Sequence, residues 1–171
     1  DSRLVILNAR DAEARGARIN VQTKVLSADQ VDGVWHVMLE NTKSTERRMV
    51  RARLLVNAGG PWVESIIRKT VRINATEGVR LVRGSHIVTH KLYDHDKCYL
   101  FQGEDGRIIF IIPYETDFTL IGTTDVDHVD VNTKPICTPE EQEYLVQFAS
   151  KYLKTTITTK HIVRTYSGVR P

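Results

Sequence analysis

The chain has 171 residues, of which 41% are hydrophobic and 26% charged, a composition typical of a globular domain with one packed core or two small ones. Its formal net charge is only +3 and its basic residues are scattered, which argues against a nucleic-acid partner. Cys98 and Cys137 have neither metal-ligand spacing nor a disulfide framework, so a reducing cytoplasm is the simplest compartment. No apolar run approaches the roughly 20 residues that span a bilayer.

The first part of the chain predicts a helix followed by a small antiparallel meander. Residues 3–15 are rich in Leu, Ala, Arg and Glu, and Gly16 suits the position just past a helix end. Asp32-Gly33 is a hairpin signal between two strand-like runs. We therefore expect a meander over 18–56 that ends in a more buried strand.

A strand, a glycine turn and a helix are then predicted in succession. The apolar run 53–56 reads as a strand, Gly59-Gly60 as a turn, and 61–69 as a short helix that proline opens. Glycine lets a ligand approach the backbone, and a helix start offers free N–H groups, so residues 57–60 could bind an anion or a cofactor. An ordinary strand-to-helix turn explains the same residues, and so short a pattern does not decide between them.

The second part of the chain predicts an antiparallel sheet with one helix. The run 108–112 has no polar alternation, so we expect it to be buried on both faces. Thr138 and Glu141 have the spacing of a capping box, which predicts a helix to about residue 153. Further strands are expected at 79–89, 98–101, 107–112, 118–121 and 161–169. The region 76–171 is thus predicted to be an α+β unit.

A histidine within the first of these strands is a candidate for chemistry. Val82, Gly84, His86 and Val88 share one face of a strand, and the glycine leaves room for a flat ligand beside the imidazole. Histidine titrates near neutrality and can accept a proton in a polar reaction. The alternative is a half-buried histidine that bonds a backbone carbonyl.

Two further segments near predicted strand ends have polar side chains that could bind a ligand. Residues 122–125, which read Gly-Thr-Thr-Asp, could line a pocket or could form a turn whose side chains bond their own backbone. Arg170 precedes Pro171, which fixes the direction of the chain, and its guanidinium could bind a phosphate or a carboxylate in bidentate fashion. A surface arginine without a ligand is the common alternative.

Four stretches taken in order carry a resemblance to a known family: LLVNAGGPW, GVRLVRGSHIV, IIFIIPYETDFTLIGTTD and IVRTYSGVRP. They resemble the FAD-dependent glycerol-3-phosphate dehydrogenases, which belong to the D-amino-acid-oxidase-like flavoproteins. The resemblance implies that 1–70 is the later part of an FAD-binding α/β domain and 71–171 most of an antiparallel-sheet substrate (cap) domain. The family's opening GxGxxG segment and its closing glycine-rich segment are not among these residues, so we expect an internal fragment that is inactive alone.

The resemblance also implies a reaction and its residues. In such enzymes sn-glycerol 3-phosphate is oxidised to dihydroxyacetone phosphate by hydride transfer to FAD, and the electrons pass to a quinone in the membrane. His86 would accept the proton of the C2 hydroxyl, and Arg170 would bind the substrate's phosphate. The backbone would contact FAD at Val25, Asn57, Ala58, Gly59 and Gly60.

Other functions and several properties of the full-length protein stay open at this point. A related flavoprotein could oxidise a 2-hydroxy acid or an amino acid, because one arginine binds carboxylate as readily as phosphate. A non-catalytic binding module is a further alternative. We expect the full-length protein to be cytoplasmic and peripherally associated with the inner membrane, with a homodimer as one possible state.

Overall fold

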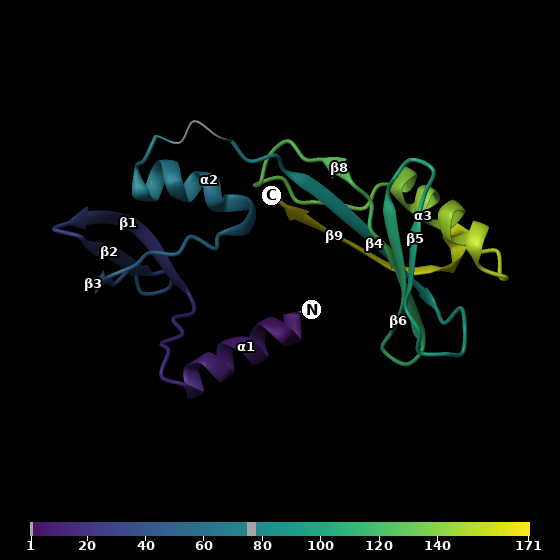
Figure 1. Ribbon diagram of the computed structural model, residues 1–171, viewed down its shortest axis with the longest axis horizontal. Coiled ribbons are helices and arrows are strands. Elements are labelled where there is room, and N and C mark those ends of the chain that lie inside the picture. Colours follow the sequence, from purple (N-terminus) through teal and green to yellow (C-terminus); the bar gives the residue numbers. More distant parts are fainter. Residues whose placement is uncertain (1, 75–77) are drawn as a thin grey trace. The chain divides into compact units, whose positions relative to one another are not determined.

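The computed structural model describes residues 2–74 and 78–171 (Figure 1). The chain divides into two compact units: unit 1 comprises Asp1–Ala58 with Ser65–Ala75, and unit 2 comprises Gly59–Glu64 with Thr76–Pro171. Each unit contains an antiparallel sheet and helical segments, which confirms the predicted α+β class. The assignment of 1–70 to an FAD-binding domain and of 71–171 to a substrate domain stays a prediction.

Unit 1 consists of a helix and a three-stranded meander, as predicted. Its elements are α1 (Ser2–Ala14), β1 (Thr23–Val31), β2 (Val34–Asn41) and β3 (Arg47–Ala52), with the sheet order β1-β2-β3. Gly16 follows α1 with a φ of +98°, which glycine adopts without steric cost. The Asp32-Gly33 hairpin is confirmed, because both residues have the positive φ values, +50° and +75°, that a two-residue turn between twisted strands requires.

The predicted buried strand at 53–56 is wrong. These residues have no regular secondary structure, and Leu54 and Val56 are 75% and 74% exposed. An apolar run becomes a strand only where a neighbour completes its hydrogen-bond ladder, and within the described part of the chain no strand pairs with this run. The helix predicted after the glycines is present as three consecutive pieces, η1 (Gly60–Trp62), α2 (Val63–Ser65) and the π-helical η2 (Ile66–Val71).

Unit 2 is a six-stranded sheet with a helix packed on one of its faces. Its strands are β4 (Val82–His90), β5 (Tyr99–Gln102), β6 (Ile108–Tyr114), β7 (Phe118–Gly122), β8 (Val126–Asp127) and β9 (Ile162–Arg170). The order is β5-β6-β7-β4-β8, and β9 also pairs with β4. Strand β4 therefore has β7 and β8 along one edge and β9 along the other.

Helix α3 (Pro139–Tyr152) closes the core of unit 2 and begins with the predicted capping box. Thr138 Oγ1 accepts a hydrogen bond from the Glu141 N–H at 3.3 Å, and the Glu141 carboxylate accepts one from the Thr138 N–H at 2.9 Å. The core joins the apolar side of α3 to the sheet through Ile87, Ile109, Ile111, Ile121, Leu145, Val146, Phe148, Ala149 and Ile157. A 3-10 turn, η3 (Thr159–His161), leads into β9.

The prediction that 108–112 is buried on both faces is also wrong. Ile109 and Ile111 are fully buried, whereas Ile108 and Phe110 are 46% and 40% exposed. Helix α3 packs on the face that carries Ile109 and Ile111, so only alternate residues of β6 are covered. In the described part of the chain, no helix has both the length and the apolar character needed to cross a membrane.

Candidate functional site

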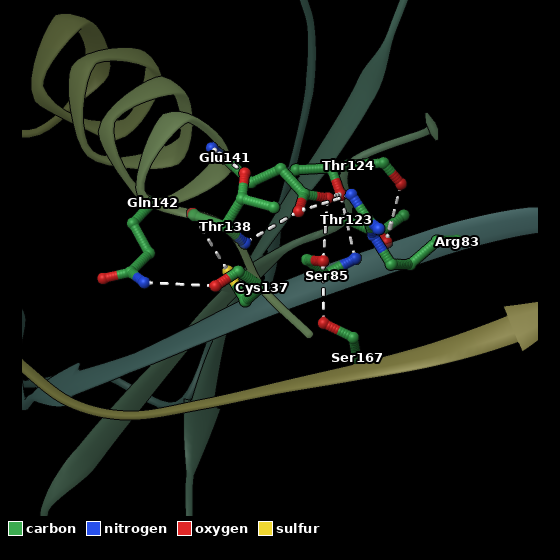
Figure 2. Close-up of polar contacts among 9 residues, drawn as sticks. All are labelled: Arg83, Ser85, Thr123, Thr124, Cys137, Thr138, Glu141, Gln142 and Ser167. Carbon is green, nitrogen blue, oxygen red and sulfur yellow. Dashed lines mark hydrogen bonds and ion pairs between the residues drawn. The ribbon is translucent and has the colours of Figure 1, made fainter. Parts of the chain in front are cut away.

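The two faces of strand β4 differ in their chemistry. Successive side chains of a strand point to opposite faces, so Arg83 and Ser85 lie on one face while Gly84 and His86 lie on the other. The side chains of Arg83 and Ser85 reach the Glu141 carboxylate at the start of α3, as Figure 2 shows. His86 therefore belongs to the face that α3 does not cover, which we call the His86 face.

The register of β4 and β9 places Arg170 on the His86 face as well. Arg170 pairs with Val82, and Tyr166 pairs with His86. Directly opposed residues of an antiparallel pair share a face, and Val82 shares its face with His86. From Val82 to His86 the strand advances about 13 Å, at about 3.3 Å per residue. The two residues predicted to act on substrate thus lie on one surface, at opposite ends of a short stretch.

His86 is held flat on this face by its neighbours. Its imidazole stacks on the Tyr166 ring, with the centroids 4.8 Å apart and the planes inclined by 6°. The ring also lies over Gly122 of the paired strand β7, where any Cβ would collide with it. The Nδ1 atom of His86 is buried and has no hydrogen-bond partner among residues 2–74 and 78–171. Burial lowers the pKa of His86 below 6.5, which favours the neutral imidazole that can accept a proton.

Arg170 forms the opposite end of the site and is paired with a carboxylate. Its Nη2 atom donates to Asp125 Oδ1 at 2.9 Å, and both side chains are about half exposed. Between Arg170 and Tyr166 on β9 lies Gly168, where a Cβ would meet no atom within 4 Å in the part of the chain that the structure describes. Across from it, a Cβ on Gly84 would lie 2.5 Å from Thr123 Oγ1, so the threonine occupies the space above that glycine. The site thus has an imidazole at one end, a guanidinium at the other and open space over Gly168 among the described residues.

A buried polar network lies on the reverse face of β4 (Figure 2). Its centre is Glu141, whose side chain is 7% exposed. Four groups donate to its two oxygens: Ser85 Oγ at 2.8 Å, Thr124 Oγ1 at 2.7 Å, Arg83 Nη2 at 3.0 Å and the Thr138 N–H at 2.9 Å. Burial alone would raise the pKa of Glu141, but these hydrogen bonds outweigh it and lower the pKa, so the carboxylate is ionised at neutral pH.

This network fixes the backbone that carries the His86 face. Ser85 Oγ also bonds Ser167 Oγ on β9 at 2.8 Å, and the Ser85 N–H donates to Thr124 Oγ1 at 2.9 Å. One buried carboxylate therefore joins α3, β4 and the segment after β7, and Ser85 extends the connection to β9. The strands that carry His86 and Arg170 are held in register from beneath.

Several of these residues were missed by sequence reasoning. The sequence predicts Glu141 only as part of the helix cap. A signal for its second role is that Arg83 and Ser85 alternate with Gly84 and His86, so both faces of this strand have residues able to form polar contacts. The segment 122–125 matches the self-bonded turn in one contact, because Thr123 Oγ1 donates to the neighbouring Thr124 carbonyl at 3.0 Å. Thr124 instead joins the buried network, which neither alternative for this segment included.

The residues predicted to contact FAD lie elsewhere in the chain. Val25 is in β1, where the register with β2 shifts between Val25 and Ser27, and it is 39% exposed. Residues 57–60 connect the irregular segment to η1. Gly60 has a φ of +52°, and a Cβ placed on it would meet no atom of the described residues within 4 Å. At Gly60 there is therefore room for a ligand against the backbone.

Comparison with known proteins places this geometry in context. The family model described as FAD dependent oxidoreductase matches residues 1–171. A curated glycerol-3-phosphate dehydrogenase of Pseudomonas tolaasii is 40% identical over 171 residues, which are 100% of this chain and 33% of that protein. A D-erythritol 1-phosphate dehydrogenase of Brucella abortus is also 40% identical over 171 residues, 100% of this chain and 34% of that protein.

A solved structure has the same fold over most of the chain. The glycerol-3-phosphate dehydrogenase from Bacillus halodurans, complexed with FAD, superposes with a TM-score of 0.76 at 28% sequence identity. The superposition covers 94% of this chain and 33% of that one. The chain therefore spans about a third of the length of the relatives it matches.

Proposed function

Because the chain belongs to the family of FAD-dependent oxidoreductases, we propose that it forms part of a dehydrogenase that oxidises sn-glycerol 3-phosphate to dihydroxyacetone phosphate. The observation that carries the proposal is the placement of His86 and Arg170 on one face of one sheet, with open space over Gly168 between them. The 40% identity to a glycerol-3-phosphate dehydrogenase supports the choice of substrate. Since the chain spans about a third of such proteins, the activity is proposed for the longer protein that carries it.

His86 is proposed to be the proton acceptor. Oxidation of a secondary alcohol removes one proton from oxygen and a hydride from carbon. Bound FAD would supply the two-electron acceptor for the hydride. Because Nδ1 of His86 is sealed from solvent, the proton of the C2 hydroxyl would be accepted at Nε2. Stacking on Tyr166 and the close approach to Gly122 hold the ring in one orientation, which a general base requires.

Arg170 is proposed to bind the phosphate. A guanidinium has five N–H donors in a fixed plane, and its contact with Asp125 uses one nitrogen at one oxygen. The remaining donors can form the paired hydrogen bonds that guanidinium makes with phosphate. Holding the phosphate at this end would fix the distance from the substrate's hydroxyl to His86, so binding energy is used to orient the reacting groups.

The residues toward FAD are proposed from the family resemblance, and the backbone at Gly60 supports one of them. Open space at the left-handed Gly60 fits a turn against which a cofactor lies. The residues proposed to hold FAD are Val25, Asn57, Ala58, Gly59 and Gly60. We propose no step that depends on their side chains.

A second candidate substrate is D-erythritol 1-phosphate. The relative of that name is as similar, at 40% identity, as the glycerol-3-phosphate dehydrogenase. Among the residues that the structure describes, none lies within 4 Å of a Cβ added at Gly168, which supports room for a longer polyol phosphate at this point. Both substrates have a phosphate that suits Arg170, whereas a 2-hydroxy acid or an amino acid would present a carboxylate.

The test is to purify the full-length flavoprotein and follow its flavin absorbance without oxygen. We expect glycerol 3-phosphate to bleach the flavin, and lactate and glycine to leave it unchanged. Bleaching by D-erythritol 1-phosphate alone would establish the second candidate, and no bleaching by any of the four would favour a non-catalytic module.

His86→Ala should lower kcat at least about 100-fold with little change in KM. His90→Ala, at the end of the same strand, is the matched control and should keep kcat within about twofold.

The electron acceptor and the location of the enzyme are part of the same proposal. We propose that a membrane quinone reoxidises the cofactor and that the full-length protein is cytoplasmic and bound peripherally to the inner membrane, either as a monomer or as a homodimer. Reduction of a water-soluble quinone by glycerol 3-phosphate, with and without added lipid vesicles, tests the acceptor and the association together.

A further inference from the structure

We propose that Asp125 is a positioning residue, which holds the Arg170 guanidinium in the orientation that receives the phosphate group of the substrate. The inference rests on the proposed function, because it assigns a role within the same site. Its basis is the ion pair between Arg170 Nη2 and Asp125 Oδ1 at 2.9 Å and the position of the two residues on the sheet. No other carboxylate among the described residues bonds Arg170.

The ion pair crosses strand β4. Arg170 lies on β9, opposite Val82, along one edge of β4. Asp125 directly precedes Val126, which pairs with Arg83 along the other edge. The two side chains therefore meet over the strand between them, and the guanidinium is drawn across the His86 face rather than outward from the end of β9.

A glycine of β4 lies close to the segment that carries Asp125. A Cβ on Gly84 would lie 2.5 Å from Thr123 Oγ1 and 3.5 Å from the Thr124 carbonyl oxygen. A side chain at this position would therefore collide with Thr123, two residues before Asp125.

Asp125 itself is anchored by its neighbours. Thr124 is 1% exposed, and its hydroxyl donates to Glu141 and accepts from the Ser85 N–H. The Thr124 N–H donates to the Ser85 carbonyl at 3.2 Å. Val126, on the other side, is part of β8. The backbone that carries Asp125 is therefore fixed on the scaffold.

The arginine alone would not be fixed. Its side chain is 59% exposed, and an exposed arginine has several rotatable bonds and many rotamers. A single contact with an anchored carboxylate selects one orientation and leaves most guanidinium donors available. Pre-organisation of this kind lowers the entropic cost of binding the phosphate.

The neighbouring ion pair offers a matched control. Asp127 bonds Arg80 at 2.6 Å, also near the surface and only two residues from Asp125. Asp127→Asn removes the same charge from the same segment without touching Arg170. An effect of general electrostatics would therefore appear in both variants, whereas a positioning effect would appear only in Asp125→Asn.

The experiment uses the full-length flavoprotein and measures KM and kcat for glycerol 3-phosphate, together with inhibition by inorganic phosphate. Asp125→Asn should raise KM about tenfold and weaken phosphate inhibition in parallel, with kcat within about twofold. Asp125→Glu keeps the carboxylate and should recover most of the affinity. Asp127→Asn should change KM by less than about twofold.

Three results would overturn the inference while the proposed function stands. Unchanged KM in Asp125→Asn would mean that Arg170 needs no partner, and a lower KM would make Asp125 a competitor of the phosphate. An equal rise in Asp127→Asn would assign the effect to charge alone. If glycerol 3-phosphate fails to bleach the wild-type flavin, both the proposed function and this inference are wrong. If the wild-type flavin bleaches and one of the three results above is found, only the inference is wrong.

Discussion

The two units bury their apolar residues to very different extents. In unit 2, nine apolar residues of the sheet, of α3 and of the segment after it form a closed core. In unit 1, the buried apolar residues among those described are Ala28 and Val37, and helix α1 has no buried residue although Leu7 and its neighbours are apolar. Secondary structure thus forms in both units from local signals, but tertiary burial is substantial only in unit 2. We expect the chain's folding free energy to come mainly from unit 2.

The sharpest test of this comparison makes the same substitution in each unit. Leu145 in α3 is fully buried, and Leu4 in α1 is 57% exposed. Leu145→Ala should lower the free energy of unfolding by about 4 kcal/mol, because it removes apolar contacts and leaves a cavity. Leu4→Ala should change it by less than about 0.5 kcal/mol. Urea unfolding of the 171-residue chain measures both, and equal effects would show that α1 has a buried partner.

The second prediction concerns the polar part of the unit 2 core. Glu141→Gln removes the charge that pairs with the largely buried Arg83 and should cost about 3 kcal/mol. Amide exchange should accelerate in β4, β9 and α3 and stay unchanged in β1 to β3. Glu143→Gln, on the same helix, removes an exposed charge and keeps an oxygen that can accept from Gln147, so it is the control. Faster exchange in unit 1 as well would mean that the two units unfold together.

Local chemistry explains which parts of the fold could be predicted. The Asp32-Gly33 hairpin and the Thr138–Glu141 cap depend on residues a few positions apart, and both were predicted correctly. The burial of 53–56 and of 108–112 was predicted wrongly. An apolar run indicates which residues can be buried. Which of them are buried depends on the element from elsewhere in the chain that packs against the run.

The candidate site was predictable in its residue types and not in its arrangement. Histidine after glycine and arginine before proline mark residues able to transfer a proton and to bind an anion. Their common face depends on the pairing of β4 with β9, which are far apart in the chain. The place of Tyr166 follows from the same long-range register, and that of Asp125 from the pairing of β4 with β8. Sequence patterns of short range contain no information on it.

The third prediction compares a glycine-to-alanine substitution in a turn of each unit. Gly33 and Gly106 both sit in turns, with φ values of +75° and +78°. Replacing either with alanine should cost about 1 kcal/mol, because a Cβ disfavours this conformation. In unit 1, which has little core, Gly33→Ala should abolish the amide protection of β1 and β2. In unit 2, Gly106→Ala should leave β5 and β6 protected, and loss of protection there would contradict the comparison.

The smallest expected effect is the pH dependence that His86 gives to unit 2. Burial lowers the pKa of this histidine in the folded chain below 6.5, so the unfolded chain binds a proton first as the pH falls. Stability should therefore decrease as the pH drops below about 6.5, and should level off once the folded form is also protonated. Urea unfolding at pH 7.5 and 5.5 measures the difference in stability, and His86→Phe, which keeps a ring against Tyr166, should reduce it.

The same lowered pKa keeps the imidazole neutral, so the acid limb of kcat/KM in the full-length enzyme should fall below pH 6.5. An acid limb above that value would mean that His86 gains a carboxylate neighbour in the complete site.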